Sequence, residues 1–170
     1  EDIDGGVAEE VMPNTFDATA MTPEQLNAAV TEALEYGHTE ISVTLAADAD
    51  ATMFSAITAA LAADGIEEGS IDLTISGAKT VPEYGFFDDN YSDNDDKNIA
   101  GDKLKSLTLT DVETIGEYAF AACTYLESVN LPQVVTIGEC AFNEWKKGTK
   151  LTSLNLPNAT TIGDWAFAYS

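Results

Sequence analysis

The sequence predicts an α/β fold in which a short region of helices and strands precedes a solenoid of about three full repeats and one degenerate repeat. Two periodicities support this prediction. Helical and strand patterns alternate over residues 22–75, and one apolar pattern then recurs every 22 to 25 residues over residues 104–170. The charge agrees with this division, because residues 1–102 hold 23 of the 30 acidic side chains.

The first elements follow a stretch without periodicity. Residues 1–20 are therefore expected to be a leader or linker, and residues 21–69 an α/β capping region. Thr22 and Gln25 have the spacing of a capping box at the start of a helix, and Gly37 stands where that helix should end.

A strand, a second helix and a second strand should follow. Residues 41–45 and 71–75 alternate between apolar and polar side chains, as strands with one buried face do. Between them, apolar residues at helical spacing predict a helix ended by Asp64-Gly65: Met53, Phe54, Ile57 and Leu61. This region is expected to cover the apolar end of the first repeat, since a repeat array needs such a cap.

The second half, residues 70–170, repeats a leucine pattern followed by Ile-Gly and Ala-Phe pairs. The three full units contain Leu104, Leu107, Leu109, Ile115-Gly116 and Ala119-Phe120; Leu126, Val129, Leu131, Ile137-Gly138 and Ala141-Phe142; and Leu151, Leu154, Leu156, Ile162-Gly163 and Ala166-Phe167. The pattern L-x-x-L-x-L at this period is typical of leucine-rich repeats, whose apolar side chains point inward from short strands. Gly116, Gly138 and Gly163 are predicted to mark turns that need freedom in φ.

A degenerate copy precedes these units and is separated from them by an acidic insertion at residues 88–102. The copy uses Leu73, Ile75, Val81 and Gly85-Phe86. Residues 88–96 are rich in Asp and Asn, whose oxygens suit Ca²⁺. The EF-hand glycine and glutamate positions are not matched, however, so a solvated insertion is the favoured interpretation and no metal site is predicted.

The charge argues against a nucleic-acid partner, and the apolar pattern argues against a transmembrane segment. All seven basic residues are lysine, and the net charge is −23. Binding to nucleic acid needs cations that displace the counterions on phosphate, so no nucleic-acid partner is expected. No apolar run approaches the ~20 residues of a spanning helix, so no transmembrane segment is predicted.

No catalytic or cofactor motif is present. The sequence lacks G-x-S-x-G, H-E-x-x-H, a Walker loop and G-x-G-x-x-G. We therefore expect a protein that is not an enzyme and has no cofactor, although its many carboxylates leave a hydrolase acting on glycan or peptide open as a further alternative.

Outward positions of the predicted strands form the candidate ligand-binding surface. They make two columns of small polar side chains on the expected concave face: Asp72, Ser106, Ser128 and Ser153; and Thr74, Thr108, Asn130 and Asn155. Concave faces are common binding surfaces of repeat proteins. The alternative interpretation is a solvated strand face with no ligand.

A second column lies beside the turn glycines. Tyr84, Tyr118, Cys140 and Trp165 occupy equivalent positions and are predicted to point outward, either as interface anchors or as local packing over adjacent units. Cys123 stands at a different position in its unit, three residues after Phe120, so no disulfide with Cys140 is predicted.

The units resemble the BspA-like leucine-rich repeats, also called the LRR_5 type. That family's pattern is roughly L-x-x-I-x-L-P followed by I-G-x-x-A-F-x-x-C, and residues 126–142 and 151–167 match it well. The unit beginning at Leu104 departs by having Thr110 where the family has proline. The resemblance covers about residues 70–170. It implies a bacterial cell-surface or secreted protein, often lipid-anchored through an upstream segment, that adheres to host proteins or to other cells.

Two functions are therefore weighed. The first is non-enzymatic adhesion to a protein or glycan of host or neighbouring cells through the repeat surface. The second is an assembly module that forms homo-oligomers, because the last unit is expected to expose Leu154, Leu156 and Ile162 unless the natural chain continues or a second copy covers them.

Overall fold

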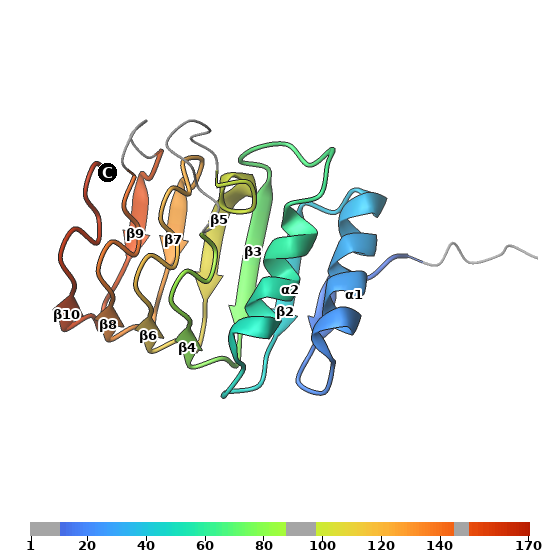
Figure 1. Cartoon of the computed structure of the whole chain (residues 1–170), viewed down its shortest axis with the longest axis horizontal. Helices are drawn as coiled ribbons and strands as arrows, with labels where there is room; N and C mark the ends of the chain where they lie inside the picture. The colour runs from blue at the N-terminus through green and yellow to red at the C-terminus, as the bar shows by residue number, and fades with distance from the viewer. Residues whose placement is uncertain (1–10, 88–97, 145–149) are drawn as a thin grey trace, which may run out of the picture.

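The computed structural model describes residues 11–87, 98–144 and 150–170, and these form two parallel sheets with two helices (Figure 1). The larger sheet has the order β1-β2-β3-β5-β7-β9 and the smaller one the order β10-β8-β6-β4. The larger sheet contains β1 (Thr15–Asp17), β2 (Glu40–Thr44), β3 (Ile71–Ser76), β5 (Leu104–Leu109), β7 (Ser128–Asn130) and β9 (Ser153–Asn155). The smaller sheet contains β4 (Thr80–Val81), β6 (Thr114–Ile115), β8 (Thr136–Ile137) and β10 (Thr161–Ile162).

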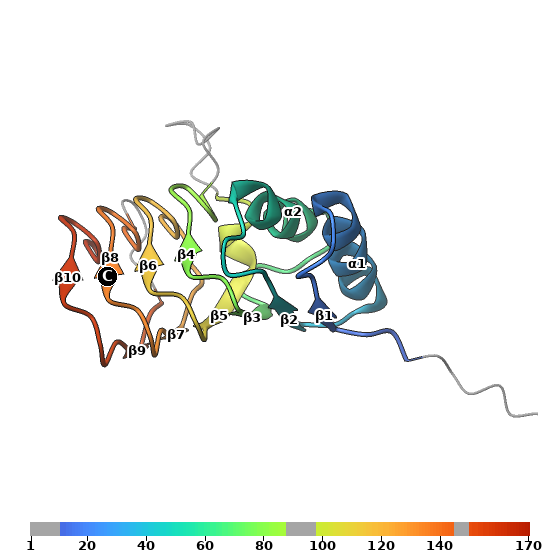
Figure 2. The same cartoon turned by 90° about the horizontal axis from the view of Figure 1, so that it is seen from below.

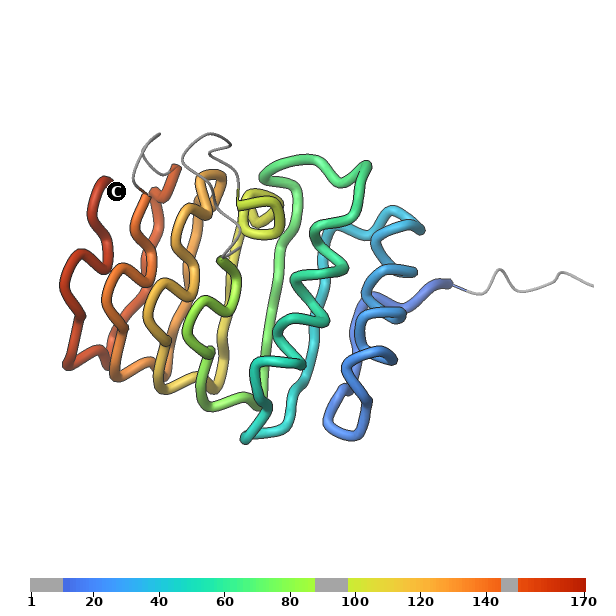
Figure 3. Tube along the Cα trace, in the orientation of Figure 1, coloured from blue at the N-terminus to red at the C-terminus, as the bar shows by residue number. Residues whose placement is uncertain are grey.

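The two sheets and two helices make two layers. Seen from below, the large sheet forms one layer, and α1 (Pro23–Tyr36), α2 (Ala51–Leu61) and the small sheet form the other (Figure 2). After each strand of the large sheet the chain therefore crosses to the second layer. After β1 and β2 it forms a helix there, and after β3, β5, β7 and β9 it forms a short strand. The trace in Figure 3 shows these successive turns of the chain side by side.

The first helix begins and ends as its sequence predicts. The amide of Gln25 donates to the Thr22 hydroxyl, and the Gln25 side chain accepts from the Thr22 amide, which completes the capping box. Gly37 ends α1 in the left-handed conformation, with φ of +107°. The second helix ends at Leu61 and not at Asp64-Gly65, because the left-handed conformation of Gly65 serves the turn that follows the helix.

The stretch predicted as a leader or linker contributes an edge strand. Strand β1 pairs in parallel with β2, and its central residue Phe16 is buried opposite Val43. Three residues are too few for a periodicity to be recognised, which is why the sequence pattern did not predict this strand. The large sheet thus runs without interruption from the N-terminal region into the repeats.

The repeat glycines have a different function from the one predicted. None of Gly116, Gly138 and Gly163 has a positive φ. A Cβ atom on Gly138 would lie 2.7 Å from the backbone nitrogen of Glu117, and a Cβ on Gly116 would lie 2.4 Å from that of Glu83. These positions need glycine because the backbone of the preceding unit passes directly over them.

The left-handed conformation belongs instead to the column beside these glycines. Tyr84, Tyr118, Cys140 and Trp165 have φ values between 53° and 59°. This conformation turns the chain so that the amide of Tyr118 donates to the carbonyl of Glu139 in the next unit, over 3.0 Å. Non-glycine residues accept such backbone strain only where surrounding contacts hold them in place.

A stack of phenylalanine rings runs through the core of the repeats. The rings of Phe86, Phe120, Phe142 and Phe167 follow one another with centroids 5.0 to 5.2 Å apart and nearly parallel planes. Phe54 of α2 meets Phe86 edge-on, with centroids 6.3 Å apart. The N-terminal region and the repeats therefore share one hydrophobic core.

The end of the predicted acidic insertion is buried rather than solvated. Asn98 is fully buried and donates to the carbonyls of Phe86 (2.7 Å) and Ala121 (2.9 Å), while its side-chain oxygen accepts from the amide of Gly101. These bonds satisfy backbone groups that would otherwise be buried without partners. The cluster at residues 88–96 that was considered for Ca²⁺ lies outside the described residues.

Asp102 is a buried carboxylate in the same segment, within the 3-10 turn Gly101–Lys103. It is 3% exposed and accepts from the amide of Thr124, whose hydroxyl donates to Glu144. Burial and, to a smaller extent, the carboxylates of Glu68 and Glu144 raise the pKa of Asp102 to about 6, against the hydrogen bonds from Thr124 that lower it.

We expect Gly138→Ala to lower the free energy of unfolding by about 3 kcal/mol or more, because the backbone of the preceding unit would have to move. Gly65→Ala is the matched control, since open space surrounds Gly65 and only its φ of +88° is strained. It should cost about 1 kcal/mol. Chemical denaturation measures both values, and equal costs would contradict the close-approach explanation.

We expect Asp102→Asn to flatten part of the dependence of stability on pH. The folded pKa of Asp102 lies above its unfolded value of 3.8, so its contribution is fully present below about pH 4 and is lost as pH rises through about 6. Between these limits the asparagine variant should gain up to about 3 kcal/mol relative to the parent.

The control for this experiment is Asp111→Asn. A hydrogen bond from the amide of Gly77 lowers the pKa of Asp111, so its contribution is present above about pH 4 and is lost only in stronger acid. The stability difference of this variant should therefore stay constant where that of Asp102→Asn changes. Urea denaturation at a series of pH values distinguishes the two, and parallel curves would contradict the assignment to Asp102.

Candidate functional site

The eight predicted surface residues lie together on the outward face of the large sheet. Strand pairing places them in two columns, Asp72, Ser106, Ser128 and Ser153; and Thr74, Thr108, Asn130 and Asn155. Between the columns, Leu73, Leu107 and Val129 point inward and are buried, whereas Leu154 on β9 is exposed. Adjacent members of a column therefore stand about 4.8 Å apart, the spacing of neighbouring strands.

Hydrogen bonds link neighbours within each column. The hydroxyl of Ser106 donates to the Asp72 carboxylate over 2.5 Å, and the Asn155 amide donates to the Asn130 oxygen over 2.7 Å. Each such bond leaves further donors or acceptors on the same side chains, since an asparagine amide offers two donors and an oxygen with two lone pairs. The face is therefore ordered and still able to bond to a polar ligand.

The N-terminal region extends this face by two strands, β2 and the edge strand β1. Glu40 and Ser42 of β2 pair with Asp72 and Thr74, and Thr44 pairs with Ser76 at a hydroxyl–hydroxyl distance of 2.9 Å. The sequence showed β2 as an alternating strand but assigned it to a separate region. Its outward residues were therefore missed, although their alternation was the signal that could have found them.

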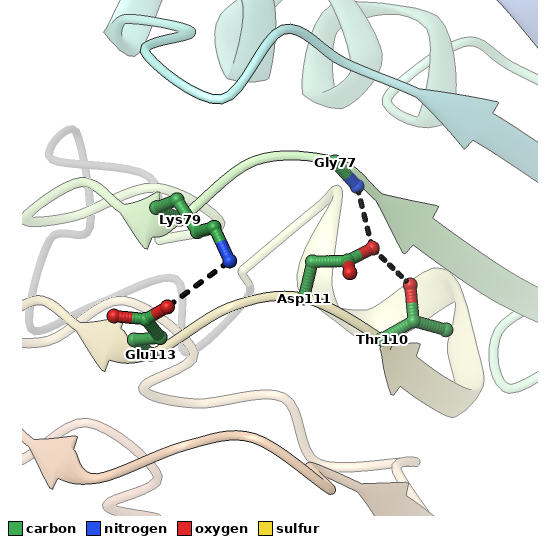
Figure 4. Close-up of polar contacts among 5 residues, drawn as sticks. All are labelled: Gly77, Lys79, Thr110, Asp111 and Glu113. Atoms are coloured by element: carbon green, nitrogen blue, oxygen red, sulfur yellow. Dashed lines mark hydrogen bonds and ion pairs between the residues drawn. The ribbon is translucent and has the colours of Figure 1, made fainter.

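Polar contacts hold the corner where the chain leaves the large sheet for the small one. The Asp111 carboxylate accepts from the amide of Gly77 and the hydroxyl of Thr110, both over 2.8 Å, and Lys79 pairs with Glu113 over 3.0 Å (Figure 4). The bonds of Asp111 lower its pKa. The residues on these two segments are separated by 34 positions, so the contacts fix the register of one unit on the next.

Only some of the four side chains in the column beside the turn glycines are exposed, contrary to the prediction that all of them point outward. Tyr84 and Trp165 are exposed, and Tyr118 is half-buried with its ring stacked on Tyr84 at a centroid distance of 5.3 Å. Cys140 is 5% exposed, contrary to the prediction that it points outward, because its smaller side chain packs against Asn143 and the Tyr118 hydroxyl. The contact with Cys140 and nearby carboxylates raise the pKa of Tyr118 to about 12.

Both cysteines are buried free thiols. Cys123 lies beside Asn98 and Gly101 at the buried end of the insertion, and its pKa is raised by burial and by the carboxylates of Asp102 and Glu144. A buried thiol with a raised pKa is a poor nucleophile, because the reactive form is the thiolate. Two further aromatic side chains of the repeats differ in exposure, since Tyr125 packs over Gly69 and Tyr169 is exposed.

Within residues 11–87, 98–144 and 150–170, no three His, Cys, Asp or Glu side chains are grouped in a way that could hold a metal ion. None of the helices in this described part has both the length and the apolar character needed to cross a membrane. The arrangement offers an extended polar sheet face and exposed aromatic side chains, both of which are features of binding surfaces.

Comparison with known proteins agrees with the repeat geometry. The family model described as "BspA type Leucine rich repeat region (6 copies)" matches residues 87–170. No curated protein and no solved structure matches the chain. Repeats of this type are typically non-enzymatic scaffolds for protein interaction in surface or secreted proteins. Residues 87–170 of the chain therefore carry repeats of the BspA-type leucine-rich repeat family.

Proposed function

We propose that this protein is a non-enzymatic adhesion protein of the bacterial surface, which binds a protein or glycan of host or neighbouring cells. The binding surface would be the outward face of the large sheet. The observation that supports this proposal is the alignment of the two polar columns across β3, β5, β7 and β9. An array of hydroxyls and amides at one spacing suits an extended partner that makes many modest contacts.

We further propose that the repeats form a solenoid and that the N-terminal region caps one end of it. The first two strands of the large sheet return through helices, and Phe54 of α2 covers the first ring of the phenylalanine stack. A cap with a polar outer face keeps the apolar core of a repeat array from water. Here α1 supplies that outer face, since Glu24, Glu32 and Glu35 are exposed on it.

We expect Asn130→Lys combined with Asn155→Lys to weaken binding to the proposed ligand about tenfold or more, because two ammonium groups would stand on the polar face across β7 and β9. A panel of immobilised extracellular-matrix proteins and mucins, measured by surface plasmon resonance, identifies the ligand and gives its affinity. Thr114→Lys with Thr136→Lys is the matched control, since these threonines pair in the same way on the small sheet. Unchanged affinity in the asparagine variant would move the site elsewhere.

A second candidate function, self-assembly, is favoured by the last described unit. Leu154 is 42% exposed and Ile162 is 54% exposed, although the equivalent Val129 and Ile137 are buried. Leu156, the third side chain expected at this end, is only partly exposed and packs on the core. Strands β9 and β10 are also the outer strands of their sheets, and unpaired strand edges accept a further strand.

If two copies meet at this end, Ile162→Lys should shift the protein toward monomer by at least tenfold in dissociation constant, because a buried apolar contact would be replaced by a charge. Light scattering over a range of concentrations measures the shift. Tyr36→Lys removes an exposed aromatic residue from α1 and serves as the control. A parent protein that is monomeric at every concentration would rule out self-assembly through this surface.

A further inference from the structure

A groove lies between α2 and the first repeat, away from the outward face of the large sheet. Its volume is about 500 Å³. Ser55 and Ala59 of α2 line one side, and Tyr84, Phe87 and Ile99 line the other. Both Tyr84 (39% exposed) and Ile99 (46% exposed) present apolar surface to solvent here, so the groove has the character of a docking site for an apolar side chain.

The exposed face of α2 carries no charge. The helix sequence from Ala51 to Leu61 contains only Ala, Thr, Met, Phe, Ser, Ile and Leu. Surface helices normally place charged side chains on their outer face, as α1 does with its glutamates. The small residues Ser55 and Ala59 also keep this side of the groove low, which leaves room for a chain to lie along the helix.

A row of carboxylates begins at the aromatic side of the groove, which Glu83 lines, and continues along the following units. Each left-handed position of the turn column is preceded by an acidic residue, and all four are exposed: Glu83, Glu117, Glu139 and Asp164. Backbone bonds hold this order, since the amide of Tyr84 donates to the carbonyl of Glu117 over 2.9 Å. Among the described residues, no lysine pairs with any of these carboxylates, and Lys79 contacts Glu113 instead.

The tyrosines at this edge are held in parallel. The rings of Tyr84 and Tyr118 are stacked with an interplanar angle of 1°, and Phe87 lies about 6 Å from both. Partial burial and the negative charges of Glu117 and Glu83 raise the pKa of Tyr84. Aromatic faces surrounded by carboxylates attract cations, because the ring quadrupole and the carboxylates act with the same sign.

The chain contains one example of this chemistry elsewhere. The ammonium group of Lys150 lies 4.3 Å above the ring of Tyr125, and the hydroxyl of Tyr125 hydrogen-bonds to Glu68. The ring of Tyr125 is thus already occupied by a lysine of the same chain. Tyr84, with Glu83 and Glu117 beside it, has the same two components and no lysine among the described residues.

We propose that the groove between α2 and the first repeat binds a segment of a partner protein in which basic and aliphatic side chains alternate. An aliphatic side chain would enter between Ala59 and Ile99. A neighbouring lysine or arginine would lie against the face of Tyr84 and the carboxylates of Glu83 and Glu117. This site is separate from the polar face of the large sheet, so the two proposals stand or fall independently.

Short end-blocked peptides test this site by isothermal titration calorimetry. The probe is Lys-Leu-Lys-Leu-Lys, and the comparison peptides are Ser-Leu-Ser-Leu-Ser and Lys-Ser-Lys-Ser-Lys. We expect the probe to bind about tenfold more tightly than either, because only the probe satisfies both the groove and the carboxylates. Its affinity should fall as salt is raised. Equal binding of the serine-leucine peptide would overturn the cationic occupant, and equal binding of the lysine-serine peptide would overturn the groove.

Two variants and their controls locate the binding. Ala59→Lys places bulk and positive charge in the groove and should weaken the probe about tenfold, whereas Ala28→Lys at an exposed position of α1 should not. Glu83→Gln with Glu117→Gln should weaken it similarly, and Glu32→Gln with Glu35→Gln removes the same charge from α1 as the control. Equal losses in a variant and its control would assign the binding to net charge and overturn the proposal, as would unchanged affinity in the groove variants.

Discussion

Successive units of this protein approach each other so closely along both sheets that their backbones are hydrogen-bonded, and most other features depend on this spacing. It admits only glycine at Gly116, Gly138 and Gly163, because any Cβ would collide with the preceding unit. It also brings Phe86, Phe120, Phe142 and Phe167 to the centroid distance of stacked rings. One distance between units thus accounts for both the recurrence of the glycines and the stacking of the phenylalanine rings.

Because the units are stacked in register, equivalent outward side chains of successive units form a column. On the large sheet this stacking produces columns of serine, threonine and asparagine that bond to one another. At the turns it produces a row of carboxylates beside a row of aromatic side chains. The near-neutral charge of the repeats therefore conceals a local concentration of negative charge at this one edge, where long-range attraction of a cationic partner would act.

Most of the local structure, in the N-terminal region as well as in the repeats, was predictable from residue patterns. Thr22, Gln25 and Gly37 defined the first helix through local hydrogen bonding, and the leucines of each unit defined which strand positions are buried. The polar columns followed from the same alternation. Predictions that required knowledge of a neighbouring unit were less successful: the glycines were assigned to strained turns, and Cys140 was placed outside although the contact with Tyr118 and Asn143 buries it.

The sequence alone determined the family of the repeats, the inward and outward positions of each strand, and the uneven distribution of charge, because each of these depends on residues close together in the chain. Only the tertiary structure decided that β1 and β2 continue the large sheet, that Asn98 is buried between Phe86 and Ala121, and that α2 and Tyr84 border one groove. These contacts join residues far apart in sequence. Their geometry depends on how one unit is seated on the next, which no local periodicity records.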